Sequence, residues 1–210
     1  MFEAWIGLGA NQGDAITTLK RARELLAMLS DQILVMSSLY ESDPWGGIDQ
    51  EVFVNQVVRI QISRAKMSHF VKSEFNCDWR ILDNLHEISA RQDSSPPYNH
   101  LQIWAERLLN ILLMTEQHLG RQRGDHEVRW GPRLIDLDLL EITPNIISNG
   151  SYKSATLSLP HPRLHVRNFV LVPWSEIGPD FVISSLGRSI DELRRSCPDL
   201  HEVRRIEYPL

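Results

Sequence analysis

A chain of 210 residues is long enough to bury a sizeable hydrophobic core and is most simply one domain, residues 1–210. The hydrophobic fraction of 42% and the charged fraction of 23% are ordinary for a globular protein. The net charge of −5 argues against a nucleic-acid-binding surface spread over the whole protein, so any anion-binding site must be local.

No apolar run approaches the length that spans a membrane, and the first residues lack the basic start and apolar stretch of a signal peptide. We therefore expect a cytoplasmic protein with no membrane contact. Cys77 and Cys197 lie far apart without a C-x-x-C partner, which favours reduced, structural thiols. The alternative is a metal cluster of Cys77 with His69 and His86, but those spacings match no common ligand pattern.

The N-terminal segment predicts a strand, a turn and a helix. Residues 4–9 are apolar enough for a short buried strand, and residues 9–14 form a glycine-containing turn. Apolar side chains then recur at helical spacing over residues 16–29. The glycines of this segment miss the G-x-G-x-x-G spacing of dinucleotide-binding proteins by one residue, so that class is not favoured.

Two further strands are expected at residues 33–40 and 52–62, separated by a loop rich in proline and glycine. In the second strand, Val54 and later alternate residues face the core, while Phe53 and Asn55 face the other way. An aromatic ring beside a carboxamide can stack on a flat heterocycle and read its hydrogen-bonding edge. A Phe53 in a second core layer with Asn55 capping a turn explains the pattern equally well.

The periodic pattern loosens from residue 64 to about 100, with a weakly amphipathic segment at 78–90 and a loop composition at 91–97. Helical periodicity returns over residues 101–119, and Gly120 predicts the end of that helix. Four arginines follow in a short span: Arg121, Arg123, Arg129 and Arg133. They can be a solvated face only, but anion binding is favoured because they converge on two aspartates in the next strand.

The two aspartates stand in residues 134–140, whose alternating pattern predicts a strand with Asp136 and Asp138 on one face. Residues two apart on a strand are separated by roughly 6.5 Å, from which two carboxylates can share hard cations such as Mg²⁺. A lone Asp-x-Asp is most often only the solvated edge of a strand. The Gly131-Pro132 turn and a tryptophan between two arginines favour a functional site, since they offer a ring surface beside phosphate-binding groups.

Near the C-terminus we expect a helix at 169–177, a short helix opened by a capping box at Ser189, and a final edge strand at 203–208. The order strand, helix, strand, strand, helix, strand predicts an α+β fold. The specific expectation is a ferredoxin-like sandwich, an antiparallel sheet with helices packed on one face, closed by the aspartate strand.

Several stretches resemble the 6-hydroxymethyl-7,8-dihydropterin pyrophosphokinases, folate-pathway enzymes that move a diphosphate from ATP to a pterin alcohol. The resembling stretches are residues 6–11, 37–46, 53–55, 120–123, 129–138, 159–163 and 167–169. The family's ferredoxin-like core agrees with the order derived above. Relative to the family pattern, residues from 64 to about 100 look inserted, and the loop between Arg123 and Trp130 looks slightly long.

The resemblance implies a role for each matching residue. Asp136 and Asp138 would bind two Mg²⁺ ions, and the implied catalytic residues are these two with Arg121, Arg123 and Arg133. The implied pterin-binding residues are Ser42, Asp43, Trp45, Phe53, Asn55, Trp130 and Phe169. The implied ATP-binding residues are Glu116, Arg121, Arg123, Arg129, Trp130, Arg133, Ser158, His161 and Arg167. No side chain stands out as a general base.

The expected function is transfer of diphosphate from ATP to the pterin hydroxymethyl group with release of AMP. We expect a monomer whose partners are these two small molecules and not nucleic acid. A ferredoxin-like phosphate- or RNA-binding module could use the same arginines, but it would not need two adjacent aspartates. A metal-dependent phosphohydrolase would keep aspartates and metals, and only the pterin-sized aromatic pocket argues against it.

Overall fold

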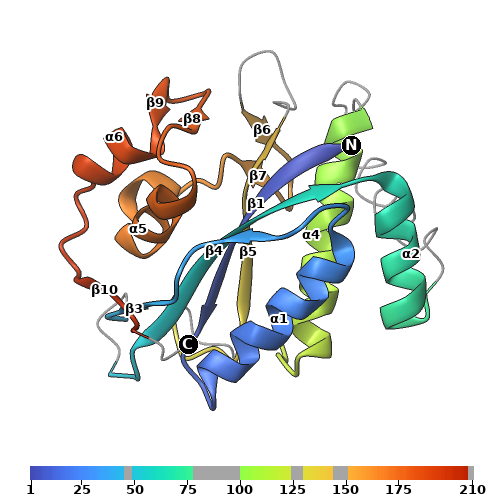
Figure 1. The fold of residues 1–210 in the computed structure, drawn as a ribbon, viewed down its shortest axis with the longest axis horizontal. Coiled ribbons are helices and arrows are strands. Elements are labelled where there is room, and N and C mark those ends of the chain that lie inside the picture. Colours follow the sequence, from blue (N-terminus) through green and yellow to red (C-terminus); the bar gives the residue numbers. More distant parts are fainter. Residues whose placement is uncertain (45–48, 78–99, 124–129, 144–150, 208–210) are drawn as a thin grey trace.

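A computed structural model describes residues 1–44, 49–77, 100–123, 130–143 and 151–207. Over these ranges the chain forms one main antiparallel sheet with helices packed on both of its faces (Figure 1). The predicted α+β class is therefore confirmed.

The main sheet is built around two long strands that pair from Phe2 opposite Ile62 to Ala10 opposite Val54. Its spatial order is β10-β3-β4-β1-β5, with β2 also paired to β4. The strands are β1 (Phe2–Ala10), β2 (Val35–Met36), β3 (Tyr40–Ser42), β4 (Phe53–Ile62), β5 (Asp136–Thr143) and β10 (Val203–Arg205). Two small hairpins lie outside this sheet and pair β6 (Tyr152–Lys153) with β7 (Ser158–Leu159), and β8 (Val182–Ile183) with β9 (Arg188–Ser189).

The helices divide between the two faces of the sheet. On one face lie α1 (Ala15–Leu29), α2 (Arg64–Phe75) and α4 (His100–His118). On the other lie α5 (Asn168–Ile177), preceded by the 3₁₀ helix η1 (Leu164–Val166), and α6 (Ile190–Arg195). After α4, Gly120 has a φ of +99°, a left-handed conformation that glycine adopts without steric cost, so the predicted helix end is confirmed.

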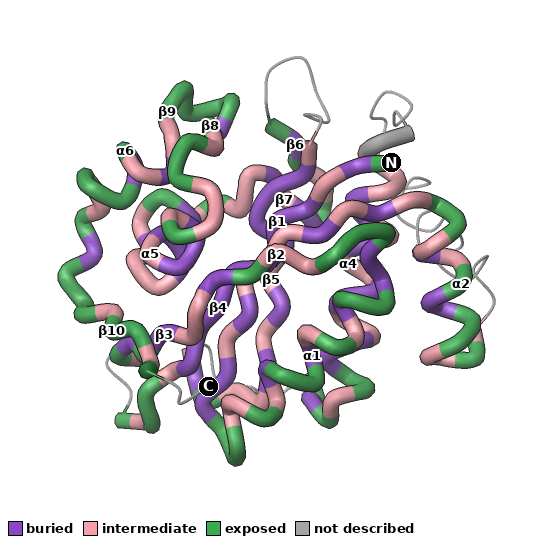
Figure 2. Tube along the Cα trace, viewed as in Figure 1, coloured by how far each residue is buried: buried purple, intermediate pink, exposed green. Residues whose placement is uncertain are grey.

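Two hydrophobic cores form because alternate residues of β1 point to opposite faces. Ile6 and Leu8 enter the larger core under α1, α2 and α4. Trp5 enters the smaller core, where its ring stacks on Trp174 of α5 with centroids 5.1 Å apart. Figure 2 shows the buried residues concentrated along the central strands. The expectation of helices on one face is therefore wrong, because a strand that is apolar on both sides needs cover on both.

Residues 33–40 were expected as one strand but form the separate short strands β2 and β3. Between them the hydroxyl of Ser37 accepts the backbone N–H of Val57 at 3.1 Å, in place of a ladder carbonyl. The aspartate strand also differs from the expected 134–140, since β5 begins at Asp136 and continues to Thr143. Local alternation does not reveal either boundary, because both depend on pairing with distant strands.

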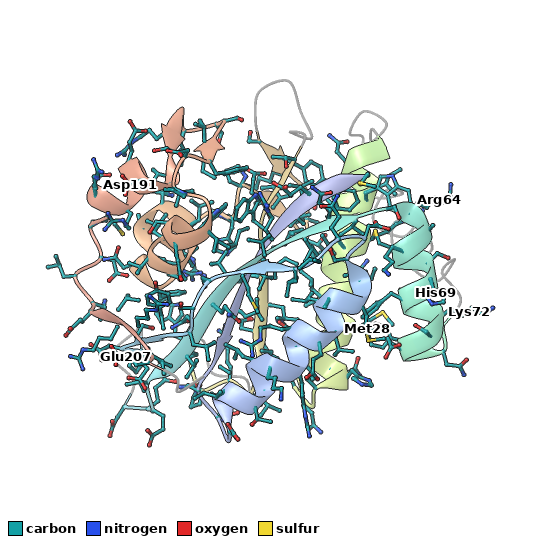
Figure 3. All side chains as sticks on the ribbon, viewed as in Figure 1. Met28, Arg64, His69, Lys72, Asp191 and Glu207 are labelled. Atoms are coloured by element: carbon teal, nitrogen blue, oxygen red, sulfur yellow. The ribbon has the colours of Figure 1, made fainter. Side chains whose placement is uncertain are left out.

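A helix that the sequence does not predict, α2, occupies residues 64–75. Met67, Phe70 and Val71 are buried against the larger core. The labelled side chains of α2 in Figure 3 are exposed and lie along the outer flank of the molecule. So few buried positions in a polar segment give a weak periodic signal, which explains the missed helix. The expected segment 78–90 and loop 91–97 lie outside the described residues.

The remaining expected elements are confirmed. Residues 16–29, 101–119 and 169–177 correspond to α1, α4 and α5. Helix α6 begins with a complete capping box between Ser189 and Glu192. Strand β10 lies at the edge of the main sheet, beside β3, and covers residues 203–205 of the expected 203–208. In the described ranges no helix combines the length and apolar character needed to cross a membrane.

Candidate active site

A cavity of about 320 Å³ lies between β1, the first halves of β4 and β5, and the start of α5. It brings together side chains that are far apart in the sequence. The predicted site residues that line it are Ser42, Asp43, Phe53, Asn55, Arg121, Arg123, Trp130, Arg133, Asp136, Asp138, His161, Arg167 and Phe169. Carboxylates, guanidinium groups and aromatic rings thus surround one space.

Two glycines of β1 leave room beside the aspartates. Gly9 lies opposite Asp136 in the β1–β5 register, and Gly7 lies opposite Asp138. Directly opposed residues of antiparallel strands share a face, so β1 places no side chain over either carboxylate. The sequence alone does not identify these glycines as site residues. Their spacing of two, matched to that of the aspartates, is the signal that could have identified them.

Asp136 is held by two arginines. Its Oδ1 accepts a hydrogen bond from Arg121 Nη1 at 2.6 Å, and its Oδ2 accepts one from Arg133 Nη1. Burial raises the pKa of Asp136, but the two guanidinium groups outweigh burial and hold the pKa below its ordinary value. Asp136 is therefore ionised at neutral pH, as a ligand for a hard cation must be.

Asp138 has a different environment. Its side chain is 35% exposed, and Arg167 Nη1 lies 3.6 Å from its Oδ2. Burial, followed by the negative charge of Asp136, raises the pKa of Asp138 to about 6. A divalent cation between the two carboxylates would remove this repulsion, so the donor set fits a metal. The described residues include no group of three or more His, Cys, Asp or Glu suited to a metal ion, so substrate or water would complete its coordination.

Glu116, from α4, lies outside the lining of this cavity, and its side chain is only 1% exposed. Its Oε1 accepts hydrogen bonds from the Leu137 backbone N–H at 2.7 Å and from Arg121 Nη1 at 3.1 Å. Its Oε2 accepts one from Arg123 Nη2 at 2.5 Å. The Arg121 side chain is 5% exposed and that of Arg123 is 50% exposed. Glu116 thus fixes Arg121 in the interior and holds Arg123 at the surface.

The turn before β5 is held by side-chain hydrogen bonds of Asn11, for which the sequence predicts no role; Asn11 and its partners form a clasp around the turn. Asn11 Oδ1 accepts the Arg133 backbone N–H at 2.7 Å, and its Nδ2 donates to Gln50 Oε1 at 3.0 Å. Gln50 in turn donates to the Trp130 carbonyl at 2.8 Å. Trp130 has a φ of +63°, uncommon for a residue other than glycine. The clasp holds this conformation and places Trp130 and Arg133 on the same cavity.

Asn55 lines the cavity from β4 and is 4% exposed. Its Nδ2 donates to Ser42 Oγ at 2.8 Å, which joins β3 to β4 at the site. Because Gly9 has no side chain, the Asn55 carboxamide can lie close to β1. The aromatic residues around the same cavity are Phe53, Trp130 and Phe169. Phe53 and Asn55 thus face an open space and not a second core layer.

His161 lies beside β5 because its backbone N–H donates to the Leu140 carbonyl at 2.8 Å. Burial, with the charges of Arg167 and Arg163, lowers the pKa of His161 to about 4, so the ring is neutral at pH 7. The Arg163 backbone N–H donates to Nδ1 at 3.3 Å. The remaining ring proton is therefore on Nε2, where it can be donated to an anion.

Some predicted site residues lie elsewhere. Ser158, on β7, does not contribute to the described lining of this cavity. Trp45 and Arg129 lie outside the described residues. The cavity is also lined by Gln56, Val57, Arg163 and Val170, for which the sequence predicts no binding role. Their contribution depends on strand register and loop packing, which no local pattern encodes.

The fold and this cavity define an α+β protein that sets a pair of acidic groups among arginines and aromatic rings. A family described as 7,8-dihydro-6-hydroxymethylpterin-pyrophosphokinase (HPPK) matches residues 5–75 and 99–179. The chain belongs to this family.

Individual relatives agree with the family match. Three proteins named 2-amino-4-hydroxy-6-hydroxymethyldihydropteridine pyrophosphokinase illustrate it. The protein from Methylorubrum extorquens is 32% identical over 87% of this chain and 87% of its own length. That from Bacillus subtilis is 33% identical over 83% and 77%, and that from Haemophilus influenzae is 30% identical over 95% and 95%.

A solved structure titled as HPPK-DHPS in complex with substrates superposes with a TM-score of 0.54 at 12% identity. The superposition covers 93% of this chain and 43% of that one. A second solved structure, HPPK-DHPS of Plasmodium falciparum, gives a TM-score of 0.53 at 14% identity over the same shares. At these identities the likeness shows a common fold.

Proposed function

We propose that this protein transfers a diphosphate from ATP to the hydroxymethyl group of 6-hydroxymethyl-7,8-dihydropterin and releases AMP, a step of folate biosynthesis. Family membership and the names of relatives that span most of the chain support this reaction. The observation that carries it is the convergence of Asp136, Asp138, arginines and aromatic rings on one cavity. The protein is an ATP-dependent diphosphokinase.

The pterin occupies the aromatic part of the cavity. Its faces contact the rings of Phe53, Trp130 and Phe169, and its polar edge meets Asn55, Ser42 and the loop of Asp43 and Trp45. The joined Ser42 and Asn55 side chains support this assignment, because a buried carboxamide that is held in place can read a donor and acceptor edge. A flat ring between aromatic side chains also buries apolar surface on both faces.

The ATP phosphates occupy the cationic part. Arg121, Arg123, Arg129, Arg133 and Arg167 neutralise them, with His161 Nε2 donating a hydrogen bond. Trp130 contacts the nucleotide, Ser158 lies at the edge of the nucleotide site, and Glu116 acts through the two arginines that it holds. The position of Arg121, Arg123, Arg133 and Arg167 around the same cavity supports this division, since guanidinium groups suit phosphate oxygens.

Asp136 and Asp138 would hold two Mg²⁺ ions, which would supply positive charge that neutralises the phosphates. In the reaction, the hydroxymethyl oxygen forms a bond to the β-phosphorus of ATP. The bond from that phosphorus to the oxygen bridging to the α-phosphate breaks, AMP leaves with that oxygen, and the hydroxyl proton passes to solvent water. The chain aligns the reactants through its aromatic walls and stabilises developing charge through its guanidinium groups, which is the main requirement of phosphoryl chemistry.

The architecture is proposed to be a ferredoxin-like sandwich in a single domain, residues 1–210, with α5 and α6 added on the second face of the sheet. The strand order β3-β4-β1-β5 supports this fold. Of these four strands in chain order, the first (β1) and the third (β4) lie at the centre, as in a ferredoxin-like sheet. An insertion at about 64–100 is also proposed, and the family match supports it for residues 76–98, which the match passes over, while residues 64–75 lie inside the match. The net charge of −5 supports a protein with small-molecule partners and no nucleic acid. We propose a cytoplasmic monomer.

The test is product analysis with ATP, Mg²⁺ and the pterin alcohol. We expect AMP in amounts equal to the pterin diphosphate, and none without the pterin. ADP or free phosphate formed without the pterin would identify a phosphohydrolase. No turnover at all, with RNA retained on the protein, would identify the binding module instead.

A further inference from the structure

The segment that follows α6 closes the N-terminus of α5. Asp199 Oδ2 accepts the backbone N–H of Asn168, the first residue of α5, at 2.9 Å. The Asn168 side-chain Nδ2 also donates to the Asp199 carbonyl. Asp199 Oδ1 is held from its other side by the His201 backbone N–H at 3.0 Å. Two segments 31 residues apart in the chain are therefore tied at one point.

Helix α5 has no cap of its own. Arg167 is its N-cap residue, and the Arg167 side chain makes no capping hydrogen bond. A helix leaves its first backbone N–H groups without partners and carries a partial positive charge at that end. The Asp199 carboxylate accepts one of these N–H groups and places a negative charge beside the partial positive charge of the helix end. Its side chain is 1% exposed, so this contact is shielded from water.

The capped turn carries two residues of the candidate active site. Arg167 and Phe169 flank Asn168, and both line the cavity. The Arg167 guanidinium lies 5.2 Å from the Phe169 ring centroid and 3.6 Å from Asp138 Oδ2. The direction in which both side chains leave the backbone depends on where the helix starts, which is the point that Asp199 holds.

We propose that Asp199 is a positioning residue for the pterin side of the active site. It sets the start of α5 and thereby the placement of Phe169 and Arg167, without touching substrate itself. The inference rests on the proposed function, because it uses the assignment of Phe169 to the pterin. Asp199 lies beyond residues 5–75 and 99–179, so the family match assigns it nothing.

The same C-terminal segment braces the pterin pocket from a second side. After His201 the chain enters β10, which pairs with β3 so that Val203 lies opposite Ser42. Ser42 in turn accepts the hydrogen bond from Asn55. The segment therefore reaches both walls that are proposed to hold the pterin, through a helix cap on one side and a strand pairing on the other.

The test compares Asp199→Ala with a matched loss of a helix cap elsewhere. Ser189 caps α6, which contributes no residue to the cavity, so Ser189→Ala removes one cap from the same C-terminal part of the chain. Helix α6 lies at the periphery of the molecule, as its labelled residue Asp191 shows in Figure 3. We measure pterin affinity by calorimetry in the presence of a non-hydrolysable ATP analogue, together with kcat, KM for each substrate and the melting temperature.

We expect Asp199→Ala to weaken pterin binding by roughly tenfold, the scale of one lost cap. The KM for ATP should change by less than the KM for the pterin. Asp199→Asn keeps an oxygen toward Asn168 and should recover most of the affinity, and it serves as the test should Asp199→Ala fail to fold. Ser189→Ala should lower the melting temperature with pterin affinity unchanged.

The inference is overturned by wild-type pterin affinity in a folded Asp199→Ala protein. It is overturned equally by the same loss of affinity in Ser189→Ala, which would show a general effect of stability. Phe169→Ala separates the inference from the proposed function. Weak pterin binding in Phe169→Ala with normal binding in Asp199→Ala contradicts the positioning role alone, while normal binding in Phe169→Ala contradicts the pocket assignment and the inference with it.

Discussion

Arg121 and Asp136 form an ion pair of 2.6 Å in which the arginine side chain is only 5% exposed. The same guanidinium donates to Glu116 Oε1 at 3.1 Å and to the Ile135 carbonyl at 3.0 Å. Arg121 is therefore built into the protein interior. Arg123 is bonded to Glu116 as well, but half of its side chain is exposed. Two neighbouring arginines of similar sequence context thus have different physical roles.

The first prediction contrasts these arginines. Arg121→Ala should lower the free energy of unfolding by about 3 kcal/mol or more, because it removes a partner of a buried carboxylate. Arg123→Ala should cost less stability than Arg121→Ala, because half of the Arg123 side chain is exposed, and should lower kcat roughly tenfold to hundredfold, since an arginine at the cavity surface can contact the phosphates mainly in the transition state. Chemical denaturation and single-turnover kinetics measure the two effects. Equal stability losses in both variants would contradict the distinction.

The second prediction concerns Asp138. Asp138→Asn should nearly abolish turnover, because it removes a negative oxygen from the proposed metal site. Its melting temperature should equal or exceed that of the wild type, since burial, followed by the neighbouring charge of Asp136, disfavours the ionised carboxylate and raises the pKa of Asp138. Calorimetric scanning without Mg²⁺ and an AMP-release assay with Mg²⁺ check both parts. Near-normal turnover at limiting Mg²⁺ would refute the metal assignment.

The third prediction concerns pterin selectivity. Asn55→Ala should weaken pterin binding by about 1–3 kcal/mol, the cost of leaving a buried polar edge unpaired, and affect ATP binding less. Ser42→Ala is the matched control, because it removes the partner that orients Asn55 while keeping the carboxamide. Its loss should be smaller. Unchanged pterin affinity in Asn55→Ala, measured by titration calorimetry, would make Asn55 a structural residue only.

The fourth prediction uses Glu141, which is 3% exposed and lies opposite Trp5 in the sheet. Burial raises the pKa of Glu141 from 4.5 to about 7. As pH rises from 4.5 to 7, the unfolded chain loses this proton first, so the free energy of unfolding should fall across that window and level off above it. Glu141→Gln should remove this fall.

At pH 8 the Glu141→Gln protein should be more stable than the wild type by about 1–3 kcal/mol. Urea denaturation at several pH values measures the difference. Glu207→Gln, the same replacement at an exposed position of the periphery (Figure 3), is the control for the change of charge. A parallel pH profile for Glu141→Gln and wild type would contradict the assignment.

Much of this protein follows from local sequence patterns. Residues 101–119 were expected to be a helix ended by Gly120, and α4 ends there, because helical periodicity and a left-handed terminating glycine act over a few residues. The shared face of Asp136 and Asp138 follows in the same way from strand alternation. Local geometry alone decides features of this kind.

Contacts between distant segments were decided only by the tertiary structure. The pairing of Gly7 and Gly9 with the aspartates depends on strand register, and the Asn11 clasp depends on three loops meeting. The burial of Glu116 beneath the arginines depends on how α4 packs against β5. No local pattern specifies such contacts, because each of them forms only when hydrophobic burial on both faces of the sheet brings the segments together.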